Sequence, residues 1–361
     1  MTAVNRRWSG ILVTWHNGEL RSGVRRQPTA IEDLDPEPPR RRRRRGVTAF
    51  LVLLVLPLLA ICVLRLGRID GNRFTVAALA LTPYFAGYGL LVTLLALALR
   101  RALITLVALV LTASLAILVI PRLLSDGDLI PEGQHVRVFS ANLLLGRADP
   151  ATVVRLIRDT QADIVTLQEL TPQAMAALDK AGLADLLPYR VLRTRTGGEG
   201  SGILARVPLR QIVLVQNRMS FEQPAAVVDL SGPVDIEILS VHTIPPVPNA
   251  TVRHRWNQEL AAMPPPDARA RPRILSGDFN ATLDHRALND LLDRGYHDAA
   301  ELAGEGLRPT WSQPPFGPPV TIDHILVDRR VGVTKVAVYD LPGSDHNAVF
   351  AELALPPGPR N

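Results

Sequence analysis

The sequence has a single cysteine, Cys62, in a chain of 361 residues, so no intrachain disulfide can form. It also shows no Cys/His spacing typical of a zinc site. The glycine-rich patterns G-x-G-x-x-G and G-x-x-x-x-G-K-[ST] are both absent, and these are the patterns that cradle the phosphates of a nucleotide. We therefore expect neither a disulfide-held fold, nor a zinc protein, nor a nucleotide cofactor.

Charged residues are missing from three long apolar runs, residues 47–64, 74–99 and 102–120. Each run is long enough to cross a hydrocarbon core of ~30 Å, which takes about 20 residues. The runs predict three transmembrane helices, with a very tight turn between the second and the third. A transporter is disfavoured, because such a protein would carry charged residues along its ion or substrate path.

The arginines predict the orientation of these helices. Six arginines at 40–45 precede the first run, and Arg100 and Arg101 separate the second from the third. By the positive-inside rule the N-terminus is predicted to be cytoplasmic, and the chain after residue 120 extracytoplasmic. The protein is thus predicted to be a multi-pass protein of the cell membrane, anchored in the lipid bilayer. Residues 1–46, rich in Arg and Pro, are predicted to be a disordered cytoplasmic tail, and residues 121–134 a linker.

Residues 135–355 have the pattern of an α/β domain. Short strands outnumber helices and often follow one another directly, as in 225–230 and 236–241. Asp149-Pro150 is typical of a helix start. This pattern favours two packed sheets with helices outside over a doubly wound parallel sheet.

One stretch of this domain has the composition of a catalytic loop. It is Gly277-Asp278-Phe279-Asn280, which follows a buried strand. Glycine permits a sharp turn, and two polar residues spaced by one can point the same way. A carboxylate then holds a water, while an amide binds a phosphate oxygen without adding repulsion. A plain polar turn after a strand is the structural alternative.

Further polar residues occur where other predicted strands end. Each of them alone is compatible with an exposed strand tip. Because strand ends at one edge of a sheet converge on a crevice, we expect the whole set to form one site. The set comprises Asn142, Glu169, His242, Asp278, Asn280, Asp323, Asp345 and His346.

The order of these residues resembles the endonuclease/exonuclease/phosphatase superfamily, which has the deoxyribonuclease I-like fold. Gly277-Asp278-Phe279-Asn280 and Ser344-Asp345-His346 carry the most specific part of this resemblance. It covers roughly residues 135–355 and does not reach the apolar runs. It implies a four-layer α/β sandwich, with two packed mixed β-sheets flanked by helices. It also implies a hydrolase acting on phosphate ester bonds, as a nuclease, phosphodiesterase or phosphatase.

The resemblance also implies a divalent cation, Mg²⁺ or Mn²⁺. Glu169 looks like its principal ligand, with Asn142 and Asp345 beside it. These are hard oxygen donors of the kind that both ions prefer. Many members carry an acidic or amide residue at the position of Leu144, so a second metal position stays open.

The remaining roles follow from the same resemblance. Asp278 looks like the residue that orients or deprotonates the attacking water. Asp345 and His346 resemble an acid–imidazole pair in which Asp345 fixes the ring. His242 resembles a proton donor to the leaving oxygen, and Asp323 a carboxylate on the phosphate-binding side. Asn280 looks like the amide that grips a phosphate oxygen.

The substrate class remains open at this stage. Scattered arginines such as Arg190 and Arg253 can form part of a basic face for DNA or RNA. Membrane tethering suits a phospholipid headgroup or another phosphate ester at the membrane surface. The alternative function is a non-catalytic membrane protein whose outer domain keeps the fold only to bind a partner, and Leu144 is its only support.

Overall fold

The computed structural model describes residues 11–16, 19–24, 39–125, 133–247, 249–313 and 317–357, with side chains from residue 44 onward. The chain divides into two units, Met1–Ala49 and Phe50–Asn361. In the first unit, strands β1 (Ile11–His16) and β2 (Glu19–Val24) pair antiparallel. The rest of the predicted cytoplasmic tail lies outside the described residues, apart from the start of helix α1 at Pro39.

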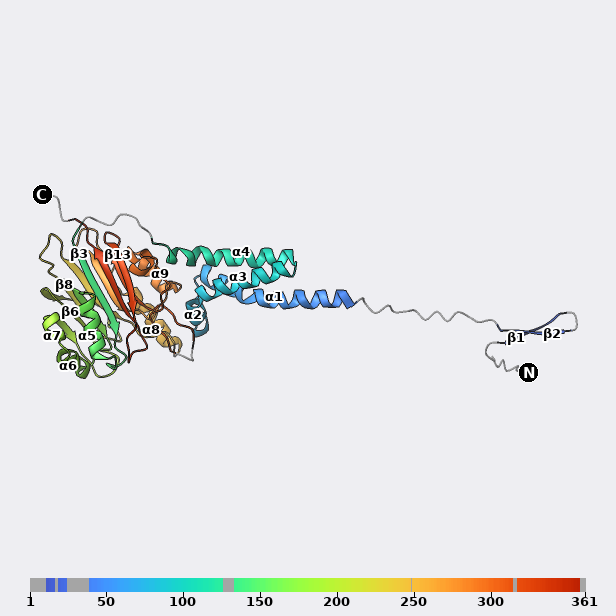
Figure 1. The fold of residues 1–361 in the computed structure, drawn as a ribbon, viewed down its shortest axis with the longest axis horizontal. Helices are drawn as coiled ribbons and strands as arrows, with labels where there is room; N and C mark the ends of the chain where they lie inside the picture. Colours follow the sequence, from blue (N-terminus) through green and yellow to red (C-terminus); the bar gives the residue numbers. More distant parts are fainter. Residues whose placement is uncertain are drawn as a thin grey trace. The chain divides into compact units, whose positions relative to one another are not determined.

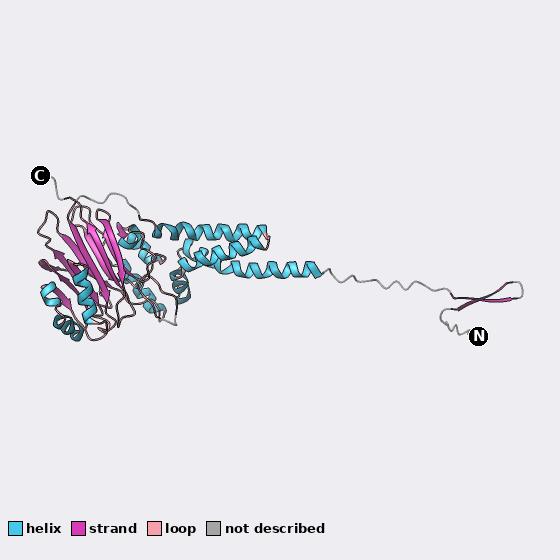
Figure 2. Ribbon diagram, in the orientation of Figure 1, coloured by secondary structure: helices cyan, strands magenta, loops and turns pink. Residues whose placement is uncertain are grey.

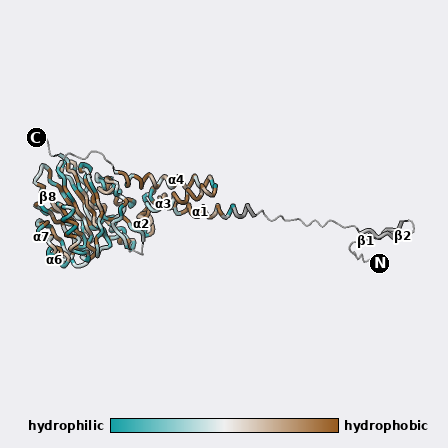
Figure 3. Tube along the Cα trace, in the orientation of Figure 1, coloured by the Kyte–Doolittle hydropathy of each residue, from teal (hydrophilic) through white to brown (hydrophobic). Residues whose placement is uncertain are grey.

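The apolar runs form helices α1 (Pro39–Leu66), α2 (Arg73–Ala80), α3 (Thr82–Ala98) and α4 (Ala102–Val119). Two segments, Arg44–Leu66 and Ala102–Leu123, are long and apolar enough to cross a membrane. The pair α2–α3 makes a third span only if the two helices are taken together, because they are bent by 68°. Figure 3 shows that the hydrophobic residues continue along α1, α3 and α4.

The break between α2 and α3 differs from the single helix that the sequence predicts over 74–99. Pro83 lies in the first turn of α3. Its ring carries no N–H and would clash with the carbonyl of Leu79, four residues earlier, if the helix continued. That carbonyl accepts a hydrogen bond from the Thr82 hydroxyl instead, at 2.7 Å. Proline therefore turns the chain within this apolar run, between α2 and α3.

The domain that follows contains two six-stranded mixed sheets (Figure 2). In the first sheet the strand order is β13-β14-β3-β4-β6-β5, and in the second it is β11-β12-β10-β9-β8-β7. The strands of the first sheet are β3 (His135–Asn142), β4 (Ile164–Gln168), β5 (Tyr189–Arg193), β6 (Ser201–Ala205), β13 (Gly332–Tyr339) and β14 (Ala348–Ala354). Those of the second sheet are β7 (Leu209–Ile212), β8 (Ala225–Val228), β9 (Ile236–His242), β10 (Arg273–Asp278), β11 (Tyr296–Asp298) and β12 (Asp323–Asp328).

Three buried clusters hold this domain in four layers. Val138 and Ile164 of the first sheet pack with Ile238 and Ile274 of the second, so the main core lies between the sheets. Helices cover the outer faces, with cores such as Ile157 against the first sheet and Trp256 against the second. The covering helices are α5 (Pro150–Asp159), α6 (Pro172–Lys180), α7 (Leu183–Leu186), α8 (Ala250–Ala261) and α9 (Arg286–Asp293). The short helix α10 (Ala299–Leu302) packs instead against the main core between the sheets. The predicted four-layer α/β sandwich is confirmed.

The apolar helices α1 to α4 dock on the domain through charged contacts at their ends. The carboxylate of Asp284, 1% exposed, accepts hydrogen bonds from two guanidinium nitrogens of Arg122 at 2.8 Å and from Nε of Arg65 at 3.0 Å. Arg68 forms more exposed ion pairs with Asp290 and Asp293. In Figure 1 the turn between α3 and α4 lies at the opposite end of these helices from the sheets. The predicted linker 121–134 contains a short 3₁₀ helix (Ile120–Leu123), and residues 126–132 of it lie outside the described residues.

Candidate active site

Strand register places three candidate side chains next to one another at one edge of the second sheet. Asp278 ends β10 and pairs with His242, which ends the parallel neighbour β9. On its other side Asp278 pairs with Asp323, which begins the antiparallel strand β12. In the first sheet Asn142, at the end of β3, pairs with Gln168, the residue before Glu169. The predicted convergence of strand ends follows from this pairing.

The backbone at this edge is held in conformations that few residues adopt. A Cβ atom on Gly277 would lie 2.0 Å from the carbonyl oxygen of Val241, so only glycine fits there. Glu169, Asn280 and Leu144 all have positive φ angles, at 54°, 48° and 45°. Such strain in non-glycine residues gathers at sites where the surrounding structure fixes a side-chain direction.

The Asp278 carboxylate is the centre of the cluster. Its Oδ2 accepts hydrogen bonds from the amides of Asn142 at 3.0 Å and Asn280 at 3.3 Å, and the Asn280 backbone donates to Oδ1 at 2.8 Å. The Nε2 atoms of two imidazoles lie near the same oxygen, His242 at 3.7 Å and His346 at 3.8 Å. One buried carboxylate is thus held between two amides and two imidazoles.

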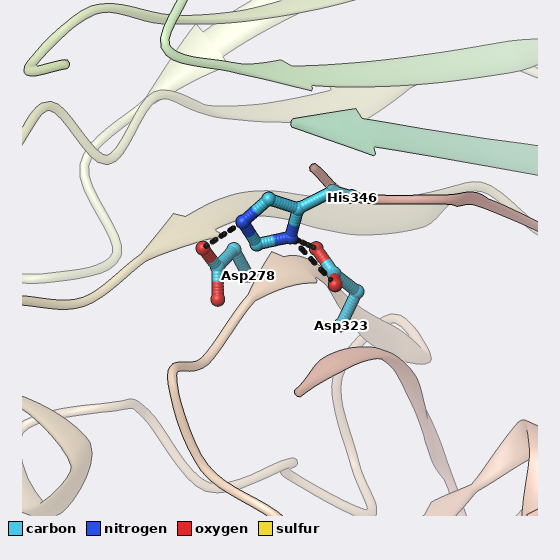
Figure 4. A group of neighbouring side chains, drawn as sticks. All are labelled: Asp278, Asp323 and His346. Carbon is cyan, nitrogen blue, oxygen red and sulfur yellow. Dashed lines mark hydrogen bonds and ion pairs between the residues drawn. The ribbon is translucent and has the colours of Figure 1, made fainter. Parts of the chain in front are cut away.

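The ring of His346 is oriented by Asp323. Its Nδ1 lies 2.9 Å and 3.2 Å from the two carboxylate oxygens of Asp323, while Nε2 faces Asp278 (Figure 4). The sequence-based assignment of Asp345 as the ring's partner is therefore wrong. Asp345 Oδ1 lies 3.9 Å from Nε2, and its Oδ2 accepts from the indole of Trp311 at 3.1 Å.

Burial and neighbouring charge set the protonation of these groups. Burial alone would lower the pKa of His346, but the carboxylates of Asp323 and Asp278 raise it, so this ring is an imidazolium at neutral pH. Burial and the positive charge of His346 lower the pKa of His242 to about 3, so that ring is neutral. Burial and the nearby Asp323 raise the pKa of the Asp278 carboxyl, which makes it a better proton acceptor.

The oxygen donors at this edge suit a divalent cation. The carboxylates of Asp278 and Asp323 belong to a group of ligand atoms that lie within 4.8 Å of one another; its third member, His346, is protonated and cannot bind a cation in that state. Asp345 Oδ1 is buried and has no hydrogen-bond partner among the described residues. The Glu169 carboxylate accepts from the Leu145 backbone at 2.6 Å and from Asn142 at 3.2 Å. A hard cation such as Mg²⁺ is the group that such a donor set fits.

These side chains face a cavity of about 730 Å³, here called the candidate pocket. Two kinds of wall enclose it. The strand-end wall carries Glu169, His242, Asp278, Asn280, Asp345 and His346. The α2 wall comes from the apolar helices and consists of Arg73, Val76, Ala77, Ala80 and Leu81, the last directly after α2.

The structure brings all eight sequence-predicted residues to this place. Six of them line the candidate pocket. The other two lie directly behind it, where Asn142 is hydrogen-bonded to Asp278 and Asp323 to His346. Sequence reasoning missed the α2 wall and Phe221, whose ring lies 4.4 Å from that of His242. No local pattern marks them, because α2 reads as part of a transmembrane run and Phe221 is isolated in a loop.

A second Asp–His pair lies next to the site without being part of it. His324 is adjacent to Asp323 in the sequence. It forms a hydrogen bond through Nδ1 with Asp298 at 2.8 Å and another through Nε2 with the Ala281 carbonyl at 2.8 Å. Both of its nitrogens are therefore used in holding β12 to its neighbours. This histidine has a structural role.

Comparison with known proteins agrees with this arrangement. A model of the Endonuclease/Exonuclease/phosphatase family matches residues 139–346, which is more than half of the chain. No curated protein matches the chain.

Several solved structures are similar. The endonuclease/exonuclease/phosphatase from Beutenbergia cavernae is 18% identical, with a TM-score of 0.48 over 62% of this chain and 72% of that one. D. rerio TDP2, complexed with single strand DNA product, is 19% identical, with a TM-score of 0.48 over 61% of this chain and 99% of that one. A Bacteroides thetaiotaomicron protein of the same family is 18% identical, with a TM-score of 0.42 over 62% and 99%.

Proposed function

Because the chain belongs to the endonuclease/exonuclease/phosphatase family, we propose that it is a membrane-anchored, divalent-metal-dependent phosphoesterase. It would hydrolyse a phosphodiester or phosphomonoester by an activated water. One observation carries the proposal: the Asp278 carboxylate lies between the imidazoles of His242 and His346 and is held by the amides of Asn142 and Asn280.

The geometry assigns a task to each of these groups. Asp278 accepts a proton from the attacking water, and its raised pKa suits that task. His346 is an imidazolium whose Nε2 faces the pocket, so it stabilises negative charge that grows on the phosphate oxygens. Its ring cannot turn freely, because Asp323 holds Nδ1. Asn280 adds a neutral donor that does not repel the substrate.

His242 takes a different task from His346. The lowered pKa of His242 favours a neutral ring, so we assign it hydrogen bonding to the reacting group rather than transfer of a proton at neutral pH. Its ring packs on Phe221, and its backbone N–H donates to Gln223 at 3.2 Å. These contacts fix the direction of Nε2.

A Mg²⁺ or Mn²⁺ ion would be held by Glu169 and Asp345, with Asn142 beside them. When bound, such an ion neutralises charge on the phosphate and polarises the phosphorus–oxygen bond. The buried Asp345 oxygen without a hydrogen-bond partner among the described residues supports this choice of ligands.

We further propose that the N-terminus is cytoplasmic and the catalytic domain extracytoplasmic. The arginines at the domain end of the helices, Arg65, Arg68 and Arg122, are ion-paired with acidic residues of the domain. Their charge is thereby offset locally. Arg100 and Arg101 lie at the other end, in the α3–α4 turn, which supports a cytoplasmic location for that turn.

The direct test is the hydrolysis of bis(p-nitrophenyl) phosphate by the full chain in detergent with MgCl₂. Asp278→Asn keeps the shape of the side chain but removes the proton acceptor, so kcat/KM is expected to fall by about 10³-fold or more. The matched control is Asp340→Asn, at an exposed position outside the candidate pocket, with activity unchanged.

Full activity in Asp278→Asn, with an unchanged thermal unfolding profile, would contradict the assignment. A wild-type protein without hydrolytic activity would favour the alternative of a binding module that only keeps the fold.

A further inference from the structure

The α2 wall points to a particular class of substrate. The candidate pocket extends from Asp278 and His346 to Val76, Ala77 and Ala80 on α2 without a break. On the domain side Leu144, Phe221 and Val247 also line it. A pocket for a fully polar phosphate ester has no use for this much apolar lining.

The position of α2 is held by specific contacts with the domain. His285 Nε2 lies 3.0 Å from the carbonyl oxygen of Val76. Arg253 donates to the Gly71 carbonyl at 3.2 Å, and the Arg286 backbone N–H donates to Asp70 at 3.2 Å. Asn72 caps the helix and completes a capping box with Thr75. The α2 wall is therefore a built part of the pocket.

The helix that follows α2 exposes apolar side chains. After the bend of 68° the chain runs on into α3, whose outward residues Leu90, Leu91 and Leu94 are all more than half exposed. Exposed leucines on a helix of this length are what a lipid-facing surface requires. A molecule anchored in the bilayer can thus lie along α3 and α2 and still reach Asp278.

A positive charge stands at the same wall. Arg73, the first residue of α2, lines the candidate pocket, and its guanidinium carbon lies 4.8 Å from the centre of the Phe74 ring. It faces a site whose other charges are the carboxylates and the His346 imidazolium. A guanidinium here can pair with a phosphate oxygen.

We propose that the substrate is an amphiphilic phosphate ester that resides in the membrane, with its apolar chain on the α2 wall and its phosphate at the strand-end wall. This inference rests on the proposed phosphoesterase function and adds the class of substrate. A nucleic acid is disfavoured, because its backbone would need a run of basic residues, whereas the α2 wall presents a single arginine beside alanine, valine and leucine.

The test uses two esters with the same scissile bond, ethyl p-nitrophenyl phosphate and hexadecyl p-nitrophenyl phosphate. Both release p-nitrophenol and differ only in the alkyl chain. The full chain is assayed in one fixed detergent, and the quantity measured is the ratio of kcat/KM for the hexadecyl ester to that for the ethyl ester. Because micelles concentrate the long ester for every variant alike, the comparison between variants isolates the contribution of the protein.

Ala77→Trp fills the α2 wall and is expected to lower this ratio by about tenfold or more, as the loss of an apolar subsite does. Ala80→Phe, one turn further along α2, fills the same wall and keeps the test valid if the tryptophan variant does not fold. The matched control is Ala98→Trp, an exposed alanine at the far end of α3 outside the pocket, for which the ratio stays as in the wild type.

An unchanged ratio in both folded α2-wall variants would overturn the proposal, as would faster hydrolysis of single-stranded DNA than of the hexadecyl ester. If neither ester is cleaved, the phosphoesterase function fails instead. The Kd of hexadecyl phosphate compared with that of ethyl phosphate then still tests the α2 wall. Equal Kd values for the two phosphates would overturn the role of the α2 wall. A higher Kd for hexadecyl phosphate in the α2-wall variants, but not in Ala98→Trp, would support it.

Discussion

The two walls of the candidate pocket differ in origin and in the forces that hold them. The strand-end wall consists of charged and amide groups fixed by sheet register and by hydrogen bonds such as that from Asn142 to Asp278. The α2 wall consists mainly of apolar side chains, with Arg73 at its start, and hydrogen bonds such as that between His285 and the Val76 carbonyl hold it against the domain. The difference supports the proposals that the strand-end wall sets the chemistry and that the α2 wall sets which molecules reach it.

The largest expected effect concerns the metal at the strand-end wall. Chelation by EDTA should abolish hydrolysis of both soluble and amphiphilic esters, and added Mg²⁺ should restore it. Glu169→Gln removes a charged oxygen donor, so the Mg²⁺ concentration giving half-maximal activity is expected to rise by about tenfold or more. A magnesium titration of the initial rate measures this.

The control for that titration is Glu222→Gln. Glu222 is ion-paired with Arg195 and does not line the candidate pocket. An equal shift of the half-maximal Mg²⁺ concentration in both variants, or activity that survives chelation, would contradict the proposal that the strand-end wall holds a catalytic metal.

A smaller effect on activity is expected from substituting Asp323, the residue that orients the His346 ring. Asp323→Asn removes a charge that raises the pKa of His346, so that pKa falls. The imidazolium is then lost at lower pH, and the alkaline limb of the pH–rate profile should move to lower pH. At neutral pH activity should fall by about tenfold or more, as for a misplaced general acid or base.

The matched control for the pH profile is Asp298→Asn, which breaks the other buried Asp–His pair, that of His324. It is expected to lower stability and leave the alkaline limb in place. An unchanged profile in Asp323→Asn would show that the protonation of His346 does not limit the reaction.

The smallest effect on chemistry is expected at the contact that docks the ends of α1 and α4 on the domain. Asp284→Asn leaves Arg122 and Arg65 without their buried counter-charge, which should destabilise the docking of the helices by about 3 kcal/mol. The midpoint of thermal unfolding in detergent should fall accordingly. The kcat/KM for the ethyl ester should change less than the ratio of kcat/KM for the hexadecyl ester to that for the ethyl ester.

Asp293→Asn is the comparison for this variant. Its ion pair with Arg68 joins the same two regions but is exposed, so its loss should cost less than about 1 kcal/mol. Equal shifts in the unfolding midpoint would mean that burial of the Asp284 contact adds nothing to the docking of these helices.

Local patterns in the sequence predicted much of this molecule. The uncharged runs indicate helices that can span a bilayer, because their length and composition suffice. Asp149 caps α5 as expected, accepting from the Thr152 backbone at 2.8 Å. The strand-end residues are brought together because polar groups that follow buried strands emerge at the same edge of a sheet.

Two features were decided by the tertiary structure alone. Asp323, rather than the sequence neighbour Asp345, orients His346, because strand pairing places residues far apart in sequence within hydrogen-bond distance. The first part of the second apolar run, before its bend of 68°, forms a wall of the candidate pocket. Hydropathy measures only whether a segment can leave water, whereas what the segment packs against depends on contacts such as His285 with Val76, which join residues distant in the chain.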